Sequence, residues 1–283
     1  MPKTVLVAET GADIPRDIAE RFGIEIVPMH VCFGDRTLPD GTFPVSDVYD
    51  YYKTTGKLPT TSGSTPEDFA TAFDRIHRLH PEANILYLAY SAITTCSFQS
   101  AQIAAQGRSY VQSIDTKQVS VGQAAVVTRL AQMVDKLPTI SMDSLKSAAN
   151  DLIEHVKMCF VPDGLEYLRA GGRVSNAQYL GAQVLKLHPL IEIHDGKLIT
   201  TKKYMGKMSK VAEKLTRDFL LAHDFARDSL WFLHSSTIDE DVRQRSEKVA
   251  KEHGFKDIVW MSTGCVVSTH SGPGAFGIVG IEQ

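Results

Sequence analysis

Short apolar runs alternate with amphipathic stretches along the first half of the chain. Residues 5–8 and 85–90 are apolar, as is typical of strands that are covered on both faces of a sheet. Between them lies a clear helix start, in which Thr65 precedes Pro66 and Asp68 follows three residues after the threonine. Apolar strands separated by helices predict a parallel sheet of the α/β, Rossmann-like type.

The same pattern predicts the other elements of this half. Strands are expected at residues 24–33 and 110–114, and helices at residues 15–22, 46–52, 94–106 and 118–136.

The pattern changes after about residue 158. Asp195 and Gly196 are a two-residue turn signal, so residues 189–203 are expected to form a hairpin. Helices are then expected at residues 209–222 and 239–252, and strands at residues 230–234, 258–261 and 278–281. We therefore expect two domains, a parallel α/β domain over residues 1–158 and a mixed α+β domain over residues 159–283. Ligands often bind at the interface between two domains, so this interface is a candidate binding site.

Composition narrows the class of protein. The chain has 283 residues, 43% of them apolar, and a formal net charge of −3, which gives no electrostatic reason to expect nucleic acid as the main partner. The N-terminus reads as a strand rather than a secretion signal, and no apolar run reaches the length of a membrane span. Four scattered cysteines without a CxxC pair favour reduced thiols. We expect a cytoplasmic protein without stable membrane insertion.

Two hydroxyl-rich segments are candidates for binding an anion. Thr61 and Ser62 precede the helix that begins at Thr65, where free backbone N–H groups attract negative charge. Thr94 and Thr95 follow the strand at residues 85–90, at the edge where open parallel sheets bind ligands. The alternative for both segments is plain helix capping.

A glycine-rich segment near the C-terminus contains His270 and Ser271. Its spelling from Gly272 to Gly277 matches a dinucleotide-binding fingerprint, but too few residues follow to supply the required helix. It is therefore expected to be a turn that holds His270 near backbone amides, with a purely structural histidine as the alternative. Gly171, Gly172 and Arg173 predict a surface turn with an exposed guanidinium. We find no set of nucleophile, base and acid.

Together these segments resemble the DegV family of fatty-acid-binding proteins over nearly the whole chain. The segments that carry the resemblance, in the family's order, are Glu9-Thr10-Gly11, Thr61-Ser62-Gly63-Ser64, Thr95-Cys96-Ser97, Gly171-Gly172-Arg173 and His270-Ser271-Gly272-Pro273-Gly274. Glu9 stands where the family usually has Asp. Met205 follows the hairpin where relatives with a kinase role often carry Arg.

The resemblance implies a lipid-binding protein rather than an enzyme. A long-chain fatty acid such as palmitate would lie between the two domains, without any other cofactor. Its carboxylate would be held by Thr61, Ser62, Thr95, His270 and Ser271, with Lys202 or Lys203 in place of the charge missing at Met205. Arg173 would dock a fatty acid kinase, which receives the bound acid in relatives.

Two other functions remain open at this stage. One is a stand-alone enzyme, a phosphotransferase or acyl hydrolase that uses His270 with a hydroxyl. The other is a regulatory module that senses lipid and binds another protein through the loop at Arg173.

Overall fold

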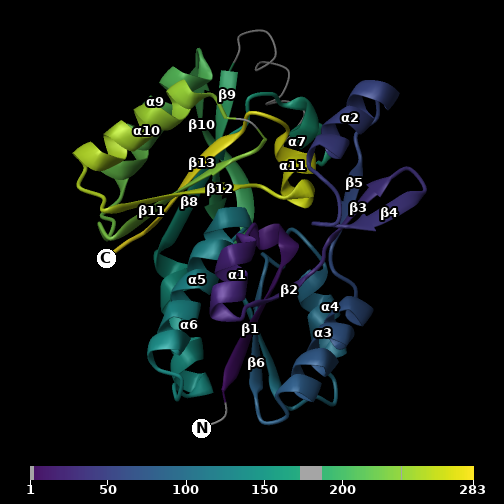
Figure 1. Cartoon of the computed structure of the whole chain (residues 1–283). Helices are drawn as coiled ribbons and strands as arrows, with labels where there is room; N and C mark the ends of the chain where they lie inside the picture. Colours follow the sequence, from purple (N-terminus) through teal and green to yellow (C-terminus); the bar gives the residue numbers. More distant parts are fainter. Residues whose placement is uncertain (1–2, 173–186, 237) are drawn as a thin grey trace.

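Two sheets, one parallel and one mixed, form the framework of the molecule (Figure 1). The computed structural model describes residues 3–172, 187–236 and 238–283. The first sheet contains, in spatial order and all parallel, β2 (Glu25–Val27), β1 (Thr4–Glu9), β6 (Asn84–Ala89) and β7 (Val111–Asp115). This confirms the parallel α/β fold predicted for the first half.

Helices cover both faces of the first sheet. One face packs against α3 (Pro66–Leu79) and α4 (Ser97–Ala104). The other packs against α1 (Arg16–Phe22), α5 (Ser120–Lys136) and α6 (Met142–His155). The expected start of α3 is confirmed, because the Thr65 side chain accepts a hydrogen bond from the amide of Asp68 at 3.1 Å, and the Asp68 carboxylate accepts one from the amide of Thr65 at 2.7 Å.

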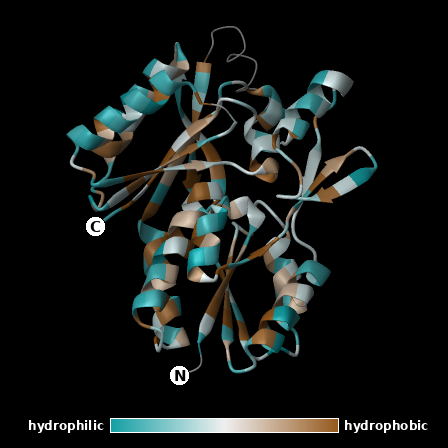
Figure 2. Cartoon of the chain, in the orientation of Figure 1, coloured by the Kyte–Doolittle hydropathy of each residue, from teal (hydrophilic) through white to brown (hydrophobic). Residues whose placement is uncertain are grey.

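The second sheet is mixed, as predicted. Its strands, in spatial order, are β10 (Lys197–Met205), β9 (Leu187–His194), β8 (Val156–Val161), β13 (Phe276–Ile281), β11 (Ser229–His234) and β12 (Asp257–Ser262). Strands β11 and β12 are parallel, and the other neighbours are antiparallel. Helices α9 (Met208–Ala222) and α10 (Glu240–Glu252) cover one face, against which their apolar residues pack. In Figure 2 both helices are largely teal, the colour of hydrophilic residues, with brown patches of hydrophobic ones.

Helix α5 joins the two halves through a shared core. Along β8, Met158 and Phe160 face the cluster that contains α5, whereas Cys159 and Val161 face α9 and α10. This alternation is the normal period of a strand. The change from the first sheet to the second occurs at the start of β8, so a domain boundary after residue 158 falls inside this strand.

A third, antiparallel sheet was not expected. It consists of β4 (Arg36–Pro39), β3 (His30–Phe33) and β5 (Thr60–Ser62). The single strand expected at residues 24–33 is wrong, since β2 and β3 belong to different sheets. Pro28, which separates them, has no N–H to continue a ladder. Helix α2 (Ser46–Thr55) leads from this sheet back to β5.

The region around His270 also differs from the expected turn. His270 lies in the last turn of a short helix, α11 (Cys265–Ser271), which ends at Gly272 with φ of 69°. The helix contains three β-branched residues, which favour strands, so its sequence does not predict a helix. Two further short elements are a 3-10 helix, η1 (Thr10–Ala12), and α7 (Glu166–Ala170). Within the described ranges, no helix combines the length and apolarity needed to span a bilayer.

Candidate functional site

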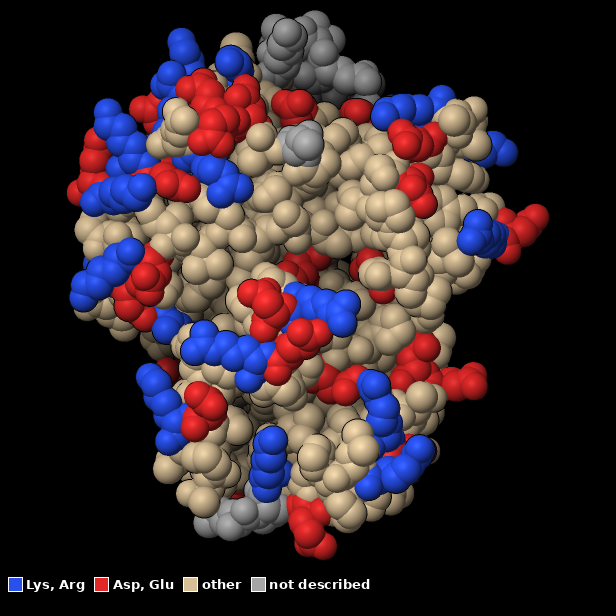
Figure 3. Space-filling model, viewed as in Figure 1, with Lys and Arg blue, Asp and Glu red and all other residues tan. Residues whose placement is uncertain are grey.

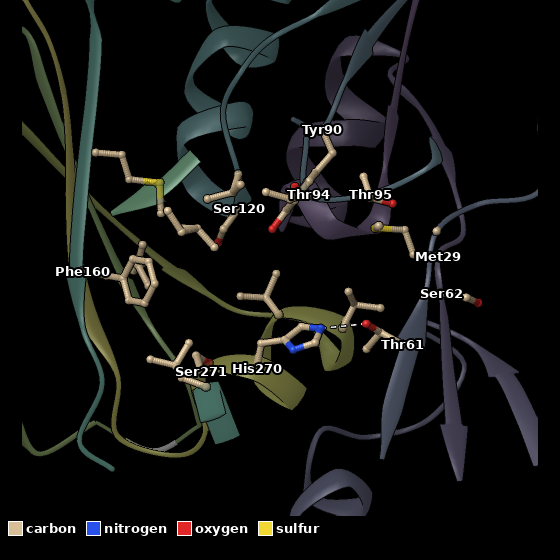
Figure 4. Close-up of a pocket in the computed structure, with 18 of the residues that line it drawn as sticks. Met29, Thr61, Ser62, Tyr90, Thr94, Thr95, Ser120, Phe160, His270 and Ser271 are labelled. Atoms are coloured by element: carbon tan, nitrogen blue, oxygen red, sulfur yellow. Dashed lines mark hydrogen bonds between the residues drawn. The ribbon is translucent and has the colours of Figure 1, made fainter. Parts of the chain in front are cut away.

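A cavity of about 350 Å³ lies between the two halves of the molecule (Figure 4). Its apolar wall comes mainly from the second half and includes Met158, Phe160, Leu168, Leu198, Leu233 and Val266. The first half contributes polar groups, among them Thr61, Tyr90, Thr94, Thr95 and Ser120. The cavity is therefore amphiphilic and lies at the interface where a ligand was expected.

Thr61 and His270 meet at the polar side of this cavity. The Thr61 Oγ1 atom lies 2.7 Å from the His270 Nε2 atom, although the two residues are 209 positions apart in the chain. Thr61 is on β5 and His270 on α11, so each half supplies one member of the pair. A hydroxyl and an imidazole at this distance can hold an oxyanion between them through charge-assisted hydrogen bonds.

Strand geometry separates Thr61 from its neighbour Ser62. Successive side chains of a strand point to opposite faces. Ser62 is exposed at the rim of the cavity, and its side chain points away from His270 in Figure 4. The two hydroxyls therefore do not converge on one point, and Thr61 is the one in contact with the histidine.

The second hydroxyl segment lies directly beside the first. The Ser97 Oγ atom lies 3.1 Å from Thr95 Oγ1 and accepts a hydrogen bond from the amide of Ser64, also at 3.1 Å. A Cβ atom at Gly63 would lie 2.5 Å from Thr95 Oγ1, so glycine is required for this close approach. The segments singled out after β5 and after β6 thus come together at one edge of the cavity.

The Gly-Gly pair makes room for the histidine. A Cβ atom at Gly171 would lie 2.3 Å from His270 Nδ1, so the imidazole packs directly against the backbone of this residue. Ser271 is buried next to His270 and also lines the cavity. Arg173, the expected docking residue, lies outside the described residues.

Lys202 is a correction to the expected site. It lies on the exposed surface of β10, where its ammonium group is 2.6 Å from the carboxylate of Asp218 on α9. Leu198, nearer the turn of the hairpin, is the residue of this strand that lines the cavity. The family resemblance offered Lys202 in place of the charge missing at Met205, but Lys202 is not among the described residues that line the cavity.

The sequence analysis did not identify Asp13 and Asp40, whose carboxyl groups contact the start of α11. Both line a second groove between the halves, and acidic side chains are visible in the hollow between the halves in Figure 3. Burial raises the pKa of Asp13 to about 8, a shift that the proximity of Asp40 increases and that hydrogen bonds from Ser120 and Gly264 reduce. The available signal was a nearby turn residue, Pro15 two positions after Asp13 and Gly41 directly after Asp40.

Glu9, to which the sequence analysis assigned no contact, lies behind the cavity. Its buried carboxyl group accepts hydrogen bonds from the Tyr87 hydroxyl, from the amide of Tyr90 at 3.1 Å and from the Gln123 side chain at 2.8 Å. Burial raises the pKa of Glu9, while these hydrogen bonds lower it. Glu9 thereby fixes the end of β6, from which Tyr90 reaches the cavity.

Ser120 has an unusual backbone conformation at the cavity wall. Its φ is 47°, and its hydroxyl donates to the carboxyl group of Asp13. A non-glycine residue in this region is strained by about 1–3 kcal/mol, and such strain clusters at functional sites. The fold holds Ser120 in this conformation between the cavity and Asp13.

Comparison with known proteins agrees with this architecture. The model of the DegV family of uncharacterised proteins matches residues 3–283. A DegV domain-containing protein of Caldanaerobacter subterraneus is 25% identical over 282 residues, which cover 98% of both chains. One from Streptomyces coelicolor is 27% identical over 285 residues, which cover 97% of this chain and 96% of the relative.

Solved structures show the same fold. A DegV family protein from Thermus thermophilus, described as fatty acid binding, superposes with a TM-score of 0.88 at 25% identity and covers 99% of this chain and 100% of its own. The fatty acid kinase B3 protein of Streptococcus pneumoniae, loaded with linoleic acid, superposes with a TM-score of 0.84 at 18% identity and covers 99% of this chain and 100% of its own. Because the family model spans nearly all of its length, the chain belongs to the DegV family.

Proposed function

We propose that this protein binds a long-chain fatty acid in the cavity between its halves and presents the carboxyl group to a partner. The observation that carries the proposal is the Thr61–His270 pair, with its 2.7 Å separation, at the polar side of a cavity whose other wall is apolar. Thr95 and Ser271 line the same cavity. The role requires no cofactor.

The two walls of the cavity match the two ends of a fatty acid. Each buried CH₂ group contributes about 0.8 kcal/mol, so a palmitate chain offers on the order of 10 kcal/mol before ordering costs. A buried carboxylate is costly unless it receives hydrogen bonds. Met158, Phe160 and Leu233 suit the acyl chain, and Thr61 with His270 suits the head.

Relatives support this ligand. The similar Thermus thermophilus protein is described as fatty acid binding, and the Streptococcus pneumoniae protein was solved with linoleic acid. The latter belongs to a fatty acid kinase, which supports a kinase as the partner of this chain. Transfer to a kinase then requires the carboxyl group to remain within reach of the rim formed by Ser62 and Cys96, both of which are exposed.

The identity of the ligand is tested in two ways, by the lipid that the purified protein contains and by its preference between two related compounds. Lipid extraction followed by mass spectrometry of the natively folded protein should detect a fatty acid. After lipid removal, the protein should bind palmitate more tightly than hexadecanol, which has the same chain without the carboxyl group. A protein that carries no fatty acid and binds neither compound would contradict the proposal.

The site for the carboxyl head group is tested by the substitution Thr61→Val. Loss of this hydroxyl should weaken palmitate binding about tenfold, the effect of one hydrogen bond to a charged group, as measured by calorimetry. The matched control is Thr60→Val, which changes an exposed hydroxyl on the opposite face of β5 and should leave the affinity unchanged. Equal losses in both variants would place the carboxyl group elsewhere.

The partner is tested with a purified fatty acid kinase and ATP. Acyl phosphate should form when the kinase and the loaded protein are both present. Turnover of ATP or acyl esters by this chain alone, abolished in His270→Ala, would instead support a stand-alone enzyme.

A further inference from the structure

The helix that carries His270 is anchored by residues from the other half of the molecule. The Asp13 carboxyl group accepts a hydrogen bond from the amide of Gly264 at 2.6 Å. The Asp40 carboxyl group accepts from the amides of Cys265 at 2.9 Å and Val266 at 3.4 Å. The first N–H groups of a helix have no acceptor within the helix itself. They normally donate to a nearby residue of the same segment.

Local capping does not explain this arrangement. The residue at the N-cap position is Gly264, which has no side chain to accept a hydrogen bond. A Cβ atom there would lie 3.2 Å from an Asp13 oxygen and 3.3 Å from an Asp40 oxygen. The glycine therefore leaves space for two carboxyl groups that come from positions 251 and 225 residues away in the chain.

The short helix α11 connects the two aspartates to the Thr61–His270 pair, the candidate site for the carboxyl head group. Val266 and His270 lie one turn apart on α11 and both line the cavity. Asp13 also accepts a hydrogen bond from Ser120, another residue of the cavity wall. Both aspartate side chains are almost fully buried, so the contact is shielded from water and sensitive to small changes.

We propose that Asp13 and Asp40 are positioning residues that hold α11 so that His270 meets Thr61, and that they thereby set the affinity for the carboxyl head of the ligand. Neither aspartate is among the described residues that line the ligand cavity. The inference rests on the proposed function. A shift of α11 separates an imidazole from a hydroxyl that now lies within 2.7 Å, whereas the opposite apolar wall, formed by β8 and β11, remains in place.

The test compares Asp40→Asn with a matched helix-capping control. Asp239→Asn has the same change at the start of α10, where Asp239 accepts from the amide of Asp241 at 3.0 Å, away from the cavity. In Asp40→Asn, palmitate affinity should fall about tenfold, while hexadecanol affinity changes less than about twofold. Asp239→Asn should change neither affinity.

A second readout follows the head group directly. The carboxyl resonance of carbon-13-labelled palmitate should shift in the Asp40→Asn complex and remain in place in the Asp239→Asn complex. An equal loss of affinity for palmitate and hexadecanol, or no loss of affinity for either, would overturn the inference. If Asp40→Asn does not fold, Asp13→Asn takes its place, and failure of both to fold counts against a positioning role that is separate from stability. A wild-type protein that does not prefer palmitate would instead refute the proposed function.

Discussion

Gly171 shows how one missing side chain shapes the candidate head site. The imidazole of His270 occupies the space where a Cβ atom would lie, at 2.3 Å from Nδ1. At the neighbouring Gly172, no atom of the described residues lies within 4 Å of where a Cβ atom would be, but φ is positive, at 66°. The two glycines of this pair therefore serve different purposes, a close contact at the first and a backbone turn at the second.

Alanine substitutions should separate these purposes. Gly171→Ala should displace His270 and weaken palmitate binding about tenfold or more, because the ring must move away from Thr61. Gly172→Ala should lower the free energy of unfolding by about 1 kcal/mol through backbone strain and leave binding nearly unchanged. Calorimetry and urea denaturation distinguish the two. Identical profiles for both variants would show that the contact at Gly171 is not specific.

Asp13 and Glu9 should make stability depend on pH in an unusual direction. Burial raises the pKa of both carboxyl groups, that of Asp13 from 3.8 to about 8. Between these values the folded state binds more protons at Asp13 than the unfolded state does, so its contribution to stability is lost as the pH rises from about 4 to 8.

The urea midpoint of Asp13→Asn should therefore decline less with rising pH than that of the wild type. Asp239→Asn, which changes an exposed carboxylate at the start of α10, should retain the wild-type slope. Parallel slopes for the wild type and Asp13→Asn would mean that Asp13 titrates as an ordinary carboxylate.

Among the elements, the β9–β10 hairpin reaches from the second sheet onto the first half. Its turn residues, Asp195 and Gly196, have φ values of 47° and 81°. The Ser91 hydroxyl donates to the carbonyl oxygen of Gly196 at 2.8 Å, and Lys117 forms an ion pair with Asp195. The tip is thus held by two loops of the first half, and Leu198 just beyond it lines the cavity.

Gly196→Ala should loosen this docking. A Cβ atom there would lie 2.6 Å from Ser91 Oγ, and the backbone would be strained, at a combined cost of about 2–3 kcal/mol in unfolding free energy. Gly254 has a similar φ of 84°, and a Cβ atom there would meet no atom of the described residues within 4 Å, so Gly254→Ala measures the strain alone. The double variant with Ser91→Ala should lose less than the sum of the single variants. Additive losses would show that the two residues do not interact.

At the scale of the whole molecule, a shared hydrophobic cluster joins the two halves. The cluster around α5 contains Leu6 and Leu86 of the first sheet together with Phe160 and Trp231 of the second. Asp13 and Asp40 add polar contacts across the same interface. Each half therefore relies on the other to bury part of its apolar surface.

Unfolding in urea should consequently show one transition. Both tryptophans, Trp231 and Trp260, lie in the second half, so their fluorescence reports that half, whereas circular dichroism reports the helices of both. The two curves should coincide within error. Two separated midpoints would show that the halves unfold independently.

Local patterns along the sequence predicted most of the elements. The capped start of α3, the turn at Asp195-Gly196 and the apolar strands β1 and β6 depend on neighbouring residues, which the sequence displays directly. The hydroxyl segments and the family resemblance likewise come from short stretches. These features determined the fold class, and they identified Thr61, Thr95 and His270 as candidates for one site.

Contacts between distant residues were decided by the tertiary structure alone. Thr61 meets His270 across 209 positions, and Asp13 meets Gly264 across 251, distances over which no local pattern carries information. The same holds for Lys202, which the family resemblance offered in place of the charge missing at Met205 and which the hairpin places against Asp218. Sequence determines which groups can bind a carboxylate, but packing of the two halves determines which of them face the same cavity.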